Sequence, residues 1–183
     1  MKIIIIGNGP SVLKEKKGKI IDSFDKIIRI NNFVIDNYEE YVGIKTNIWY
    51  RSDAPDIYNY NLNNFEKVYF CLPPANFNKK DRIGRIKKIM INNCKIIPKK
   101  MVEELIKKCN LGKKWPTTGL ITLYHILKKY DNYSIHIYGF DCFLKNNYKH
   151  YYNNEKNISK GHKNIKEKLF IQNYINEGKL KKI

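Results

Sequence analysis

Residues 2–11 have the sequence Lys2-Ile3-Ile4-Ile5-Ile6-Gly7-Asn8-Gly9-Pro10-Ser11, a short apolar run that ends in a glycine-rich turn. A run that is apolar on both faces is typical of a parallel strand covered by helices on both sides of its sheet. At the carboxyl end of such a strand, glycines let the backbone approach a ligand, and the next helix start offers free amide donors to a phosphate. The turn is neither a GxGxxG fingerprint nor a P-loop, so alone it is equally consistent with a simple strand-to-helix connection.

Short β-branched runs of the same kind alternate with helical patterns along the chain. The predicted strands are residues 2–6, 26–31, 47–51, 67–72, 95–97 and 134–138, and the predicted helices are residues 101–109, 120–130 and a last helix after residue 161. This alternation predicts one α/β domain over residues 1–183, Rossmann-like, with a mostly parallel sheet flanked by helices. Residues 53–64 are predicted to be a surface excursion. Residues 146–161 are predicted to be a long polar loop, whose tyrosines and histidine favour a functional role.

The charge of the chain is strongly positive. Its 183 residues include 35 Lys and Arg against 17 Asp and Glu, a formal net charge of +18, and 43% are hydrophobic, which predicts a folded domain. The basic residues are 31 Lys and only 4 Arg, and together with 29 Ile and 23 Asn they match the bias of an A+T-rich gene. The charge is therefore weak evidence for nucleic-acid binding. It is compatible with anionic nucleotide sugars, acidic glycans or peripheral contact with an anionic membrane.

Membrane-spanning and metal-binding patterns are missing from the sequence. No apolar run approaches the roughly 18–20 residues that span a bilayer, and no convincing signal peptide is present. The four cysteines show neither CxxC spacing nor a compact framework, so we expect free buried thiols and, without a secretion signal, a reducing cytoplasm. The cysteines are Cys71, Cys94, Cys109 and Cys142.

Further stretches follow the first turn in a recognisable order. They are Asp22-Ser23-Phe24-Asp25 with Arg29-Ile30-Asn31, then Val42-Gly43-Ile44-Lys45-Thr46, then Trp115-Pro116-Thr117-Thr118-Gly119-Leu120 with Tyr138-Gly139-Phe140, then His150-Tyr151-Tyr152, and last His162 with Glu167. In this order they resemble the large, small, third and very small sialylmotifs of the sialyltransferases of glycosyltransferase family 29. The glycine turn, the Thr-Thr-Gly loop and the late histidine are also similar to the bacterial sialyltransferases of family 42.

The resemblance implies a fold and an activity. The fold would be a GT-A-like sialyltransferase variant. The activity would be inverting, metal-independent transfer of sialic acid from CMP-sialic acid to a hydroxyl of an acceptor glycan or glycolipid. By resemblance His162 is the general base, and His150 with a neighbouring tyrosine contacts the departing phosphate. The chain departs from the family's Golgi members, because residues 1–52 contain no cysteine for the disulfide that links the large and small motifs there.

The residues are consistent with the chemistry of a CMP-sugar. The leaving group carries a single phosphate, whereas nucleoside diphosphate sugars usually need a divalent metal held by a DxD pair. The sequence contains no DxD, HxH or clustered His/Asp site, so we expect no metal and no cofactor. An acceptor hydroxyl must lose a proton as it attacks, and a histidine near its ordinary pKa of about 6.5 suits that work. His162 precedes a predicted helix start, where the dipole favours the neutral imidazole.

Several polar residues are predicted to meet the donor at the carboxyl ends of the strands. Asn8 and Asn31 follow the first two strands and offer neutral amide donors to phosphate or sugar oxygens. Thr117, Thr118 and Gly119 precede a helix and could hold the sialic acid carboxylate or the cytidine, or only cap that helix. The predicted donor-binding residues are Gly7, Asn8, Gly9, Asn31, Thr117, Thr118, Gly119, Gly139, Tyr151 and Tyr152.

For four other polar residues the sequence does not require a role in the active site. Glu167 either orients a partner or favours its helix start, and Asp141 need be no more than a turn residue. His125 lies in a predicted helix and His136 in a predicted strand, so both are expected to be structural.

Two alternative functions stay open at this point. Another CMP-activated sugar acid, such as CMP-3-deoxy-octulosonate, or a catalytically decayed CMP-binding relative would use the same residues. A basic nucleic-acid-binding protein would explain the charge, but arginine is scarce and no recognition motif is present. The sequence carries no prediction of the acceptor or of the oligomeric state.

Overall fold

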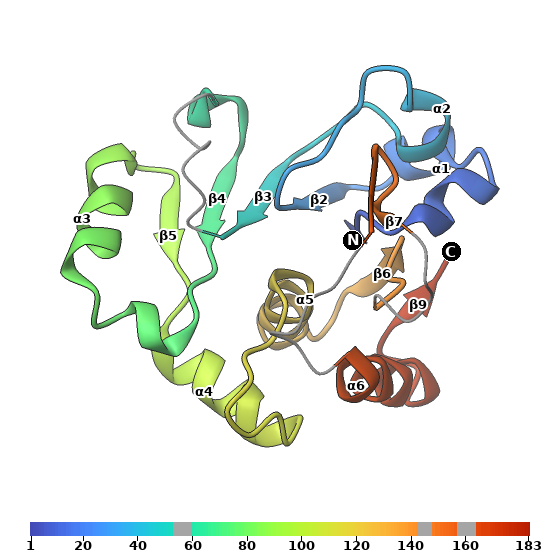
Figure 1. The fold of residues 1–183 in the computed structure, drawn as a ribbon. Coiled ribbons are helices and arrows are strands. Elements are labelled where there is room, and N and C mark those ends of the chain that lie inside the picture. Colours follow the sequence, from blue (N-terminus) through green and yellow to red (C-terminus); the bar gives the residue numbers. More distant parts are fainter. Residues whose placement is uncertain (53–59, 143–147, 157–163) are drawn as a thin grey trace.

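A seven-stranded parallel sheet forms the centre of the computed structural model, which describes residues 1–52, 60–142, 148–156 and 164–183 (Figure 1). The strands of this sheet are β1 (Lys2–Ile6), β2 (Lys26–Ile30), β3 (Ile48–Arg51), β4 (Lys67–Phe70), β5 (Cys94–Ile96), β6 (Ser134–Tyr138) and β9 (Lys181–Lys182). Their order across the sheet is β5-β4-β3-β2-β1-β6-β9. The predicted α/β fold with a mostly parallel sheet is confirmed.

Helices cover both faces of the sheet. They are α1 (Gly18–Asp22), α2 (Glu39–Val42), α3 (Lys80–Ile89), α4 (Lys99–Lys108), α5 (Thr118–Lys129) and α6 (Asn164–Asn176), with 3₁₀ turns at η1 (Pro10–Lys14), η3 (Leu62–Asn64) and η4 (Pro74–Asn76). In β1, Ile3 and Ile5 pack with residues of α4, α5 and α6, whereas Ile4 and Ile6 pack with residues of η1, α1 and α2. This division explains why the first strand is apolar on both faces.

The chain reverses its direction of travel across the sheet next to β1. From β1 to β5 each new strand is added on one side, and the chain then returns to place β6 on the other side of β1. The register pairs Ile6 of β1 with Tyr138 of β6 and with Arg29 of β2. The carboxyl ends of β1, β2 and β6 therefore meet at this reversal, which is where open parallel sheets bind their ligands.

Some elements were not predicted. Residues 146–161, expected to be a loop, include a two-stranded antiparallel hairpin of β7 (Tyr148–His150) and β8 (Asn153–Lys156). Helix α3 and the short edge strand β9 were also missed, because α3 is rich in lysine and arginine and β9 has only two residues. Of the predicted surface excursion 53–64, residues 60–64 are described, and within them Leu62 is buried in the core.

The cysteines and two of the histidines behave as structural residues. All four thiols are free, as predicted, with Cys142 less buried than the others. His125 of α5 shares a 2.6 Å hydrogen bond with the hydroxyl of Tyr50, and burial lowers the pKa of this histidine to about 4. His136 of β6 shares a 2.9 Å hydrogen bond with Ser134. No helix in the described ranges has both the length and the apolar character needed to cross a bilayer.

Candidate functional site

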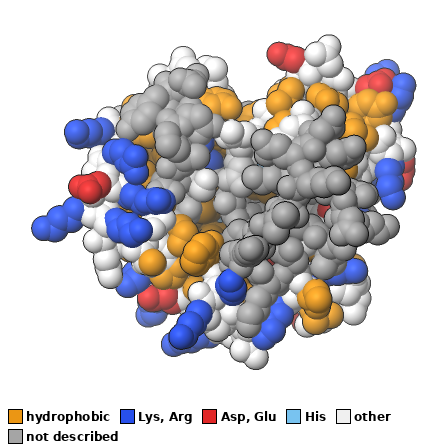
Figure 2. Space-filling model, viewed as in Figure 1, with side chains coloured by type: hydrophobic (Ala, Val, Ile, Leu, Met, Phe, Trp, Pro, Cys, Tyr) orange, Lys and Arg blue, Asp and Glu red, His pale blue; other side chains and the backbone are white. Residues whose placement is uncertain are grey.

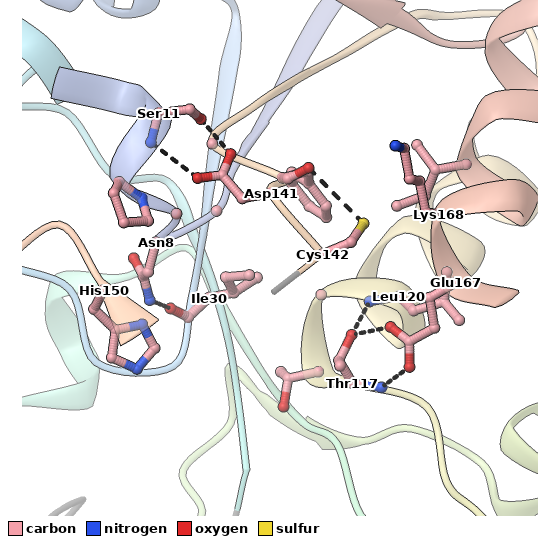
Figure 3. A pocket seen from close by; sticks show the side chains of 18 of the residues that line it. Asn8, Ser11, Ile30, Thr117, Leu120, Asp141, Cys142, His150, Glu167 and Lys168 are labelled. Carbon is pink, nitrogen blue, oxygen red and sulfur yellow. Dashed lines mark hydrogen bonds between the residues drawn. The ribbon is translucent and has the colours of Figure 1, made fainter. Parts of the chain in front are cut away.

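A cavity of about 430 Å³ opens where the carboxyl ends of β1, β2 and β6 meet (Figure 3). Figure 3 shows Asn8 and His150 at one side of it and Thr117 and Glu167 at the other. Nine of the predicted site residues line this cavity: Gly7, Asn8, Gly9, Asn31, Thr117, Thr118, Gly119, Gly139 and His150. The structure thus brings together residues from five separate stretches of the sequence. The predicted base His162 falls in the segment 157–163, outside the described residues.

The glycines of the first turn allow the turn after β1 to pack closely against the segment after β6 in the cavity wall. The Gly7 N–H donates to the Tyr138 carbonyl at 2.7 Å, and the Gly9 N–H donates to the Gly139 carbonyl at 3.0 Å. A Cβ on Gly7 would lie 2.3 Å from the Gly139 carbonyl oxygen, closer than real atoms approach. Gly139 itself has φ of +69°, which favours glycine. Backbone packing therefore requires glycine at both positions, and both residues also line the cavity.

Asp141 fastens the loop after β6 to the turn after β1. Its carboxylate accepts a 2.9 Å hydrogen bond from the Ser11 N–H and a second, short one from the Ser11 hydroxyl. Asp141 is therefore more than a turn residue, because it holds together two segments that are 130 residues apart in the sequence.

The two asparagines use their amides differently. The Asn8 side chain is only 8% exposed, and its NH₂ group donates to the Ile30 carbonyl at 2.9 Å and to the Asn32 carbonyl at 2.7 Å. Its donors are thus taken, and its amide oxygen is what remains for a ligand. Asn31 has φ of +50°, and its amide oxygen accepts the Ser52 N–H at 3.2 Å. Within the described residues its NH₂ group has no partner, so Asn31 offers the donor that was expected of both.

The start of α5 forms the opposite wall. Thr117 is the N-cap, and its hydroxyl accepts the Leu120 N–H at 3.1 Å. The first turn of this 12-residue helix contains no acidic residue, and with the Leu120 N–H bound to the cap, the N–H groups of Thr118 and Gly119 present partial positive charge to the cavity. Capping and ligand binding are compatible here, because the capping bond occupies Thr117 and leaves Thr118 and Gly119 along the cavity wall.

Glu167 of α6 is a buried carboxylate bound to the same N-cap. It is 3% exposed and accepts hydrogen bonds from the Thr117 N–H at 2.9 Å and the Thr117 hydroxyl at 2.6 Å. Burial raises the pKa of this carboxyl group to about 7, against the lowering effect of the two Thr117 hydrogen bonds. Of the two interpretations left open by the sequence, the contacts favour the one in which Glu167 orients a partner.

The hairpin β7–β8 brings His150 to the cavity but not the two tyrosines that follow it. The Tyr151 hydroxyl accepts the Val34 N–H at 3.1 Å and donates a short hydrogen bond to the Val34 carbonyl. The Tyr152 hydroxyl donates to the Asn32 carbonyl at 2.8 Å, and its ring stacks on that of His150 with centroids 5.2 Å apart. Tyr151 and Tyr152 thus anchor the hairpin to the segment after β2, and neither lines the cavity.

Most of the large motif lies away from the cavity. The Arg29 guanidinium is 1% exposed and donates to the Val42 and Gly43 carbonyls at 2.8 and 2.9 Å and to the Thr46 hydroxyl at 2.8 Å. Burial lowers its pKa to about 10. The Asp22 carboxylate accepts the N–H groups of residues 44 and 45, each at 3.0 Å. These residues hold the segment 42–46 in place. Of the part of this motif that follows the glycine turn, only Ile30 and Asn31 line the cavity.

Three lysines of the cavity were not singled out by the sequence. Lys14, Lys168 and Lys182 line it together with two carboxylates, Asp141 and Glu167, which are both engaged in hydrogen bonds. In a chain with 31 lysines no individual lysine is conspicuous, although Lys168 is adjacent to a motif residue. The described part of the chain contains no group of three or more His, Cys, Asp or Glu side chains able to hold a metal ion.

Comparisons with solved structures connect this architecture to sialyltransferases. The fold matches a mammalian sialyltransferase solved in complex with Gal-beta-1-3GalNAc-ortho-nitrophenol, with a TM-score of 0.75 and 17% identity over 100% of this chain and 68% of the other. It also matches the sialyltransferase CstII from Campylobacter jejuni in complex with a substrate analogue, cytidine-5'-monophosphate, with a TM-score of 0.60 and 16% identity over 99% and 79% of the two chains. At these identities the likeness is one of fold.

Comparisons of sequence are more specific. A stretch of 42 residues is 50% identical to part of Sialyltransferase-like protein 2 of Arabidopsis thaliana. This stretch covers 23% of this chain and 10% of that protein. The aligned stretch is thus about a tenth of the length of this relative. The model of glycosyltransferase family 29 (sialyltransferase) matches residues 2–55 and 56–179. Because this match extends over nearly the whole sequence, the chain belongs to glycosyltransferase family 29.

Proposed function

We propose that the protein transfers sialic acid from CMP-sialic acid to a hydroxyl of an acceptor glycan, with inversion at the anomeric carbon and without a metal ion. One observation carries the proposal. A single cavity at the reversal of the sheet is lined by the start of α5, by Asn31 with an unused amide donor, and by His150. The fold and the family are those of sialyltransferases.

The charge of the cavity suits this donor. CMP-sialic acid carries one negative charge on its phosphodiester and one on its carboxylate. Lys14, Lys168 and Lys182 offer positive charge, and the N–H groups of Thr118 and Gly119 at the start of α5 can donate hydrogen bonds to an anion. The volume of about 430 Å³ is within the usual range of small-molecule sites. We assign the anionic groups of the donor to this wall of lysines and amides.

Departure of CMP leaves a phosphate monoester whose charge must be stabilised. His150, from the hairpin, lies at the cavity beside the turn that carries Asn8. A protonated imidazole or a donated N–H at this place would stabilise the leaving phosphate. A single phosphate needs less neutralisation than a diphosphate, which is the chemical basis for proposing a reaction without a divalent ion.

The acceptor hydroxyl must be deprotonated as it attacks the anomeric carbon from the face opposite CMP. By family resemblance this role belongs to His162, which is two residues before the first residue of α6. Glu167, in the first turn of the same helix, lines the cavity, so α6 connects the assigned base to the donor wall. In the proposed step the hydroxyl proton passes to the imidazole as the new glycosidic bond forms and the bond to CMP breaks.

The test is an assay of transfer with two donors. The protein is incubated with CMP-sialic acid or CMP-3-deoxy-octulosonate, a panel of galactosides and excess EDTA, and products are identified by mass. Transfer of sialic acid in EDTA is the expected result. Transfer from the other donor alone would replace the donor assignment, and loss of activity in EDTA with rescue by Mn²⁺ would contradict the metal-independent reaction. A protein that neither transfers sugar nor binds CMP would contradict the function as a whole.

A further inference from the structure

Helix α3 presents a concentration of positive charge at the edge of the sheet that lies far from the cavity. Within residues 79–88 the exposed side chains are Lys79, Lys80, Arg85, Lys87 and Lys88, with one acidic residue, Asp81. In the described part of the chain no ion pair joins any of these five basic groups to a carboxylate. Figure 2 shows basic side chains gathered at the left of the molecule, where α3 lies in Figure 1.

The composition of the chain does not explain this patch. An A+T-rich gene accounts for many lysines but not for arginines, of which the chain has only 4. Arg29 and Arg51 are both 1% exposed and belong to the interior. The other two arginines, Arg82 and Arg85, both lie in α3. All the arginine that is not in the core is therefore in this one helix.

The apolar side of α3 is already occupied, so the charged side faces outward on a fixed support. Ile86 is 3% exposed and packs in a core cluster with Trp49, Val68 and Phe70. On the outer side, a Cβ built on Gly84 would have no atom within 4 Å. Lys80, Lys87 and Lys88 lie on the same side as Gly84 by helical periodicity. Together they form a convex, positively charged surface.

This surface is separate from the proposed active site. Helix α3 connects β4 to β5, and β5 is the edge strand of the sheet. Three strand spacings, each of about 4.8 Å, separate β5 from β2, the nearest strand that contributes to the cavity. A ligand on the outer face of α3 would leave the cavity accessible, so the patch has no evident part in binding the donor.

We infer that the outer face of α3 docks the protein on an anionic phospholipid bilayer. A flat anionic surface can engage several charges of a convex helix at once. Each Lys or Arg near the surface contributes about 1 kcal/mol to the binding free energy, which raises the partition coefficient about fivefold. Ile91, two residues beyond the helix, is 38% exposed and supplies an apolar side chain next to the charges, as interfacial helices do. The face carries no aromatic side chain on which nucleic-acid bases could stack. Lipid is therefore the better complement.

Sedimentation with vesicles tests the inference on the full chain. The triple variant Lys80→Gln, Lys87→Gln, Lys88→Gln removes three charges from α3. The control triple Lys2→Gln, Lys19→Gln, Lys181→Gln removes three exposed charges from β1, α1 and β9, which are outside α3. The wild type should bind vesicles of phosphatidylcholine with phosphatidylglycerol, and more weakly as NaCl rises. The α3 triple should lose about 100-fold in partition and the control less than about tenfold. Turnover of a soluble acceptor should be equal in all three proteins.

The other outcomes overturn the inference. Equal partition of the wild type into vesicles with and without phosphatidylglycerol would exclude an anionic lipid surface. Equal losses in the two triple variants would show an effect of net charge and not of α3. Binding of single-stranded RNA through α3 without binding to vesicles would assign the patch to another polyanion. None of these results depends on the donor assignment, because vesicle binding is measured without substrate.

Discussion

The carboxylate of Glu167 in α6 accepts both the N–H and the hydroxyl proton of Thr117, the residue that caps α5, at 2.9 and 2.6 Å. The two residues are 50 positions apart in the sequence. The Thr117 hydroxyl in turn accepts the Leu120 N–H at 3.1 Å. The start of the helix that lines the cavity is thus oriented by the carboxyl group of a residue from another helix.

Replacing Glu167 with Gln should flatten the dependence of stability on pH. In the folded protein burial raises the pKa of Glu167 from 4.5 to about 7, so folding favours its protonated form. The contribution of this group to the free energy of unfolding is therefore greatest below about pH 4.5 and is lost as pH rises through 7, by on the order of 1–3 kcal/mol. Urea unfolding of both proteins at pH 5, 6, 7 and 8 measures the difference.

The control for this series is Glu103→Gln, at an exposed carboxylate of α4 that pairs with Lys99. It should keep the wild-type decline in stability, whereas Glu167→Gln should not. Parallel curves for the wild type and Glu167→Gln would show that Glu167 does not titrate in this range.

Alanine at two glycines should have opposite effects on stability. Gly7→Ala would place a Cβ 2.3 Å from the Gly139 carbonyl oxygen, so the turn after β1 and the segment after β6 must separate, at a cost of about 1–3 kcal/mol or more. Gly84→Ala lies in the interior of α3 with no atom within 4 Å of the new methyl group, and should stabilise the protein by about 0.5–1 kcal/mol. Thermal unfolding gives both values. A neutral Gly7→Ala would contradict the close packing of these two segments.

Substitutions at two residues of the large motif should have different effects, one on CMP binding and the other on stability. Asn31→Asp keeps the oxygen that accepts the Ser52 N–H but replaces the unused NH₂ group with a negative oxygen, and should weaken CMP binding about 10- to 100-fold. Arg29→Lys cannot satisfy the same set of carbonyl groups, and should lower the free energy of unfolding by about 1–3 kcal/mol while the folded protein binds CMP normally. Calorimetric titration measures CMP binding, and urea unfolding measures stability, for both variants. Weakened CMP binding by folded Arg29→Lys, with Asn31→Asp only destabilised, would contradict this division.

Removal of the two candidate catalytic histidines should affect different steps. His162→Ala should lower kcat for transfer by about 10²–10⁴-fold with little change in CMP affinity. His150→Ala should slow hydrolysis of the donor as well as transfer, because it removes stabilisation of the leaving phosphate. His136→Gln, at a histidine bonded to Ser134 outside the cavity, serves as the control and should leave kcat unchanged. Transfer by folded His162→Ala within about threefold of the wild type would remove the assignment of the base.

The sequence by itself was sufficient for the sheet and for the general place of the site. Short runs such as Ile3–Ile6 are apolar at every position, and this pattern is local, so six of the seven strands of the sheet could be predicted with ends within two residues. The glycine turn and the Thr-Thr-Gly stretch could be assigned to the carboxyl edge because parallel strands all end at the same edge. The family resemblance rests on the same local stretches.

Only the tertiary structure decided what most of the motif residues do. It divided the large motif into Asn31, which faces the cavity, and Arg29 and Asp22, which hold the segment 42–46. It also showed that the donors of Asn8 are already used, and that Asp141 and Glu167 bind residues 130 and 50 positions away. Periodicity and propensity describe neighbours along the chain, whereas hydrogen-bond partners at such separations are fixed by how strands and helices pack in space.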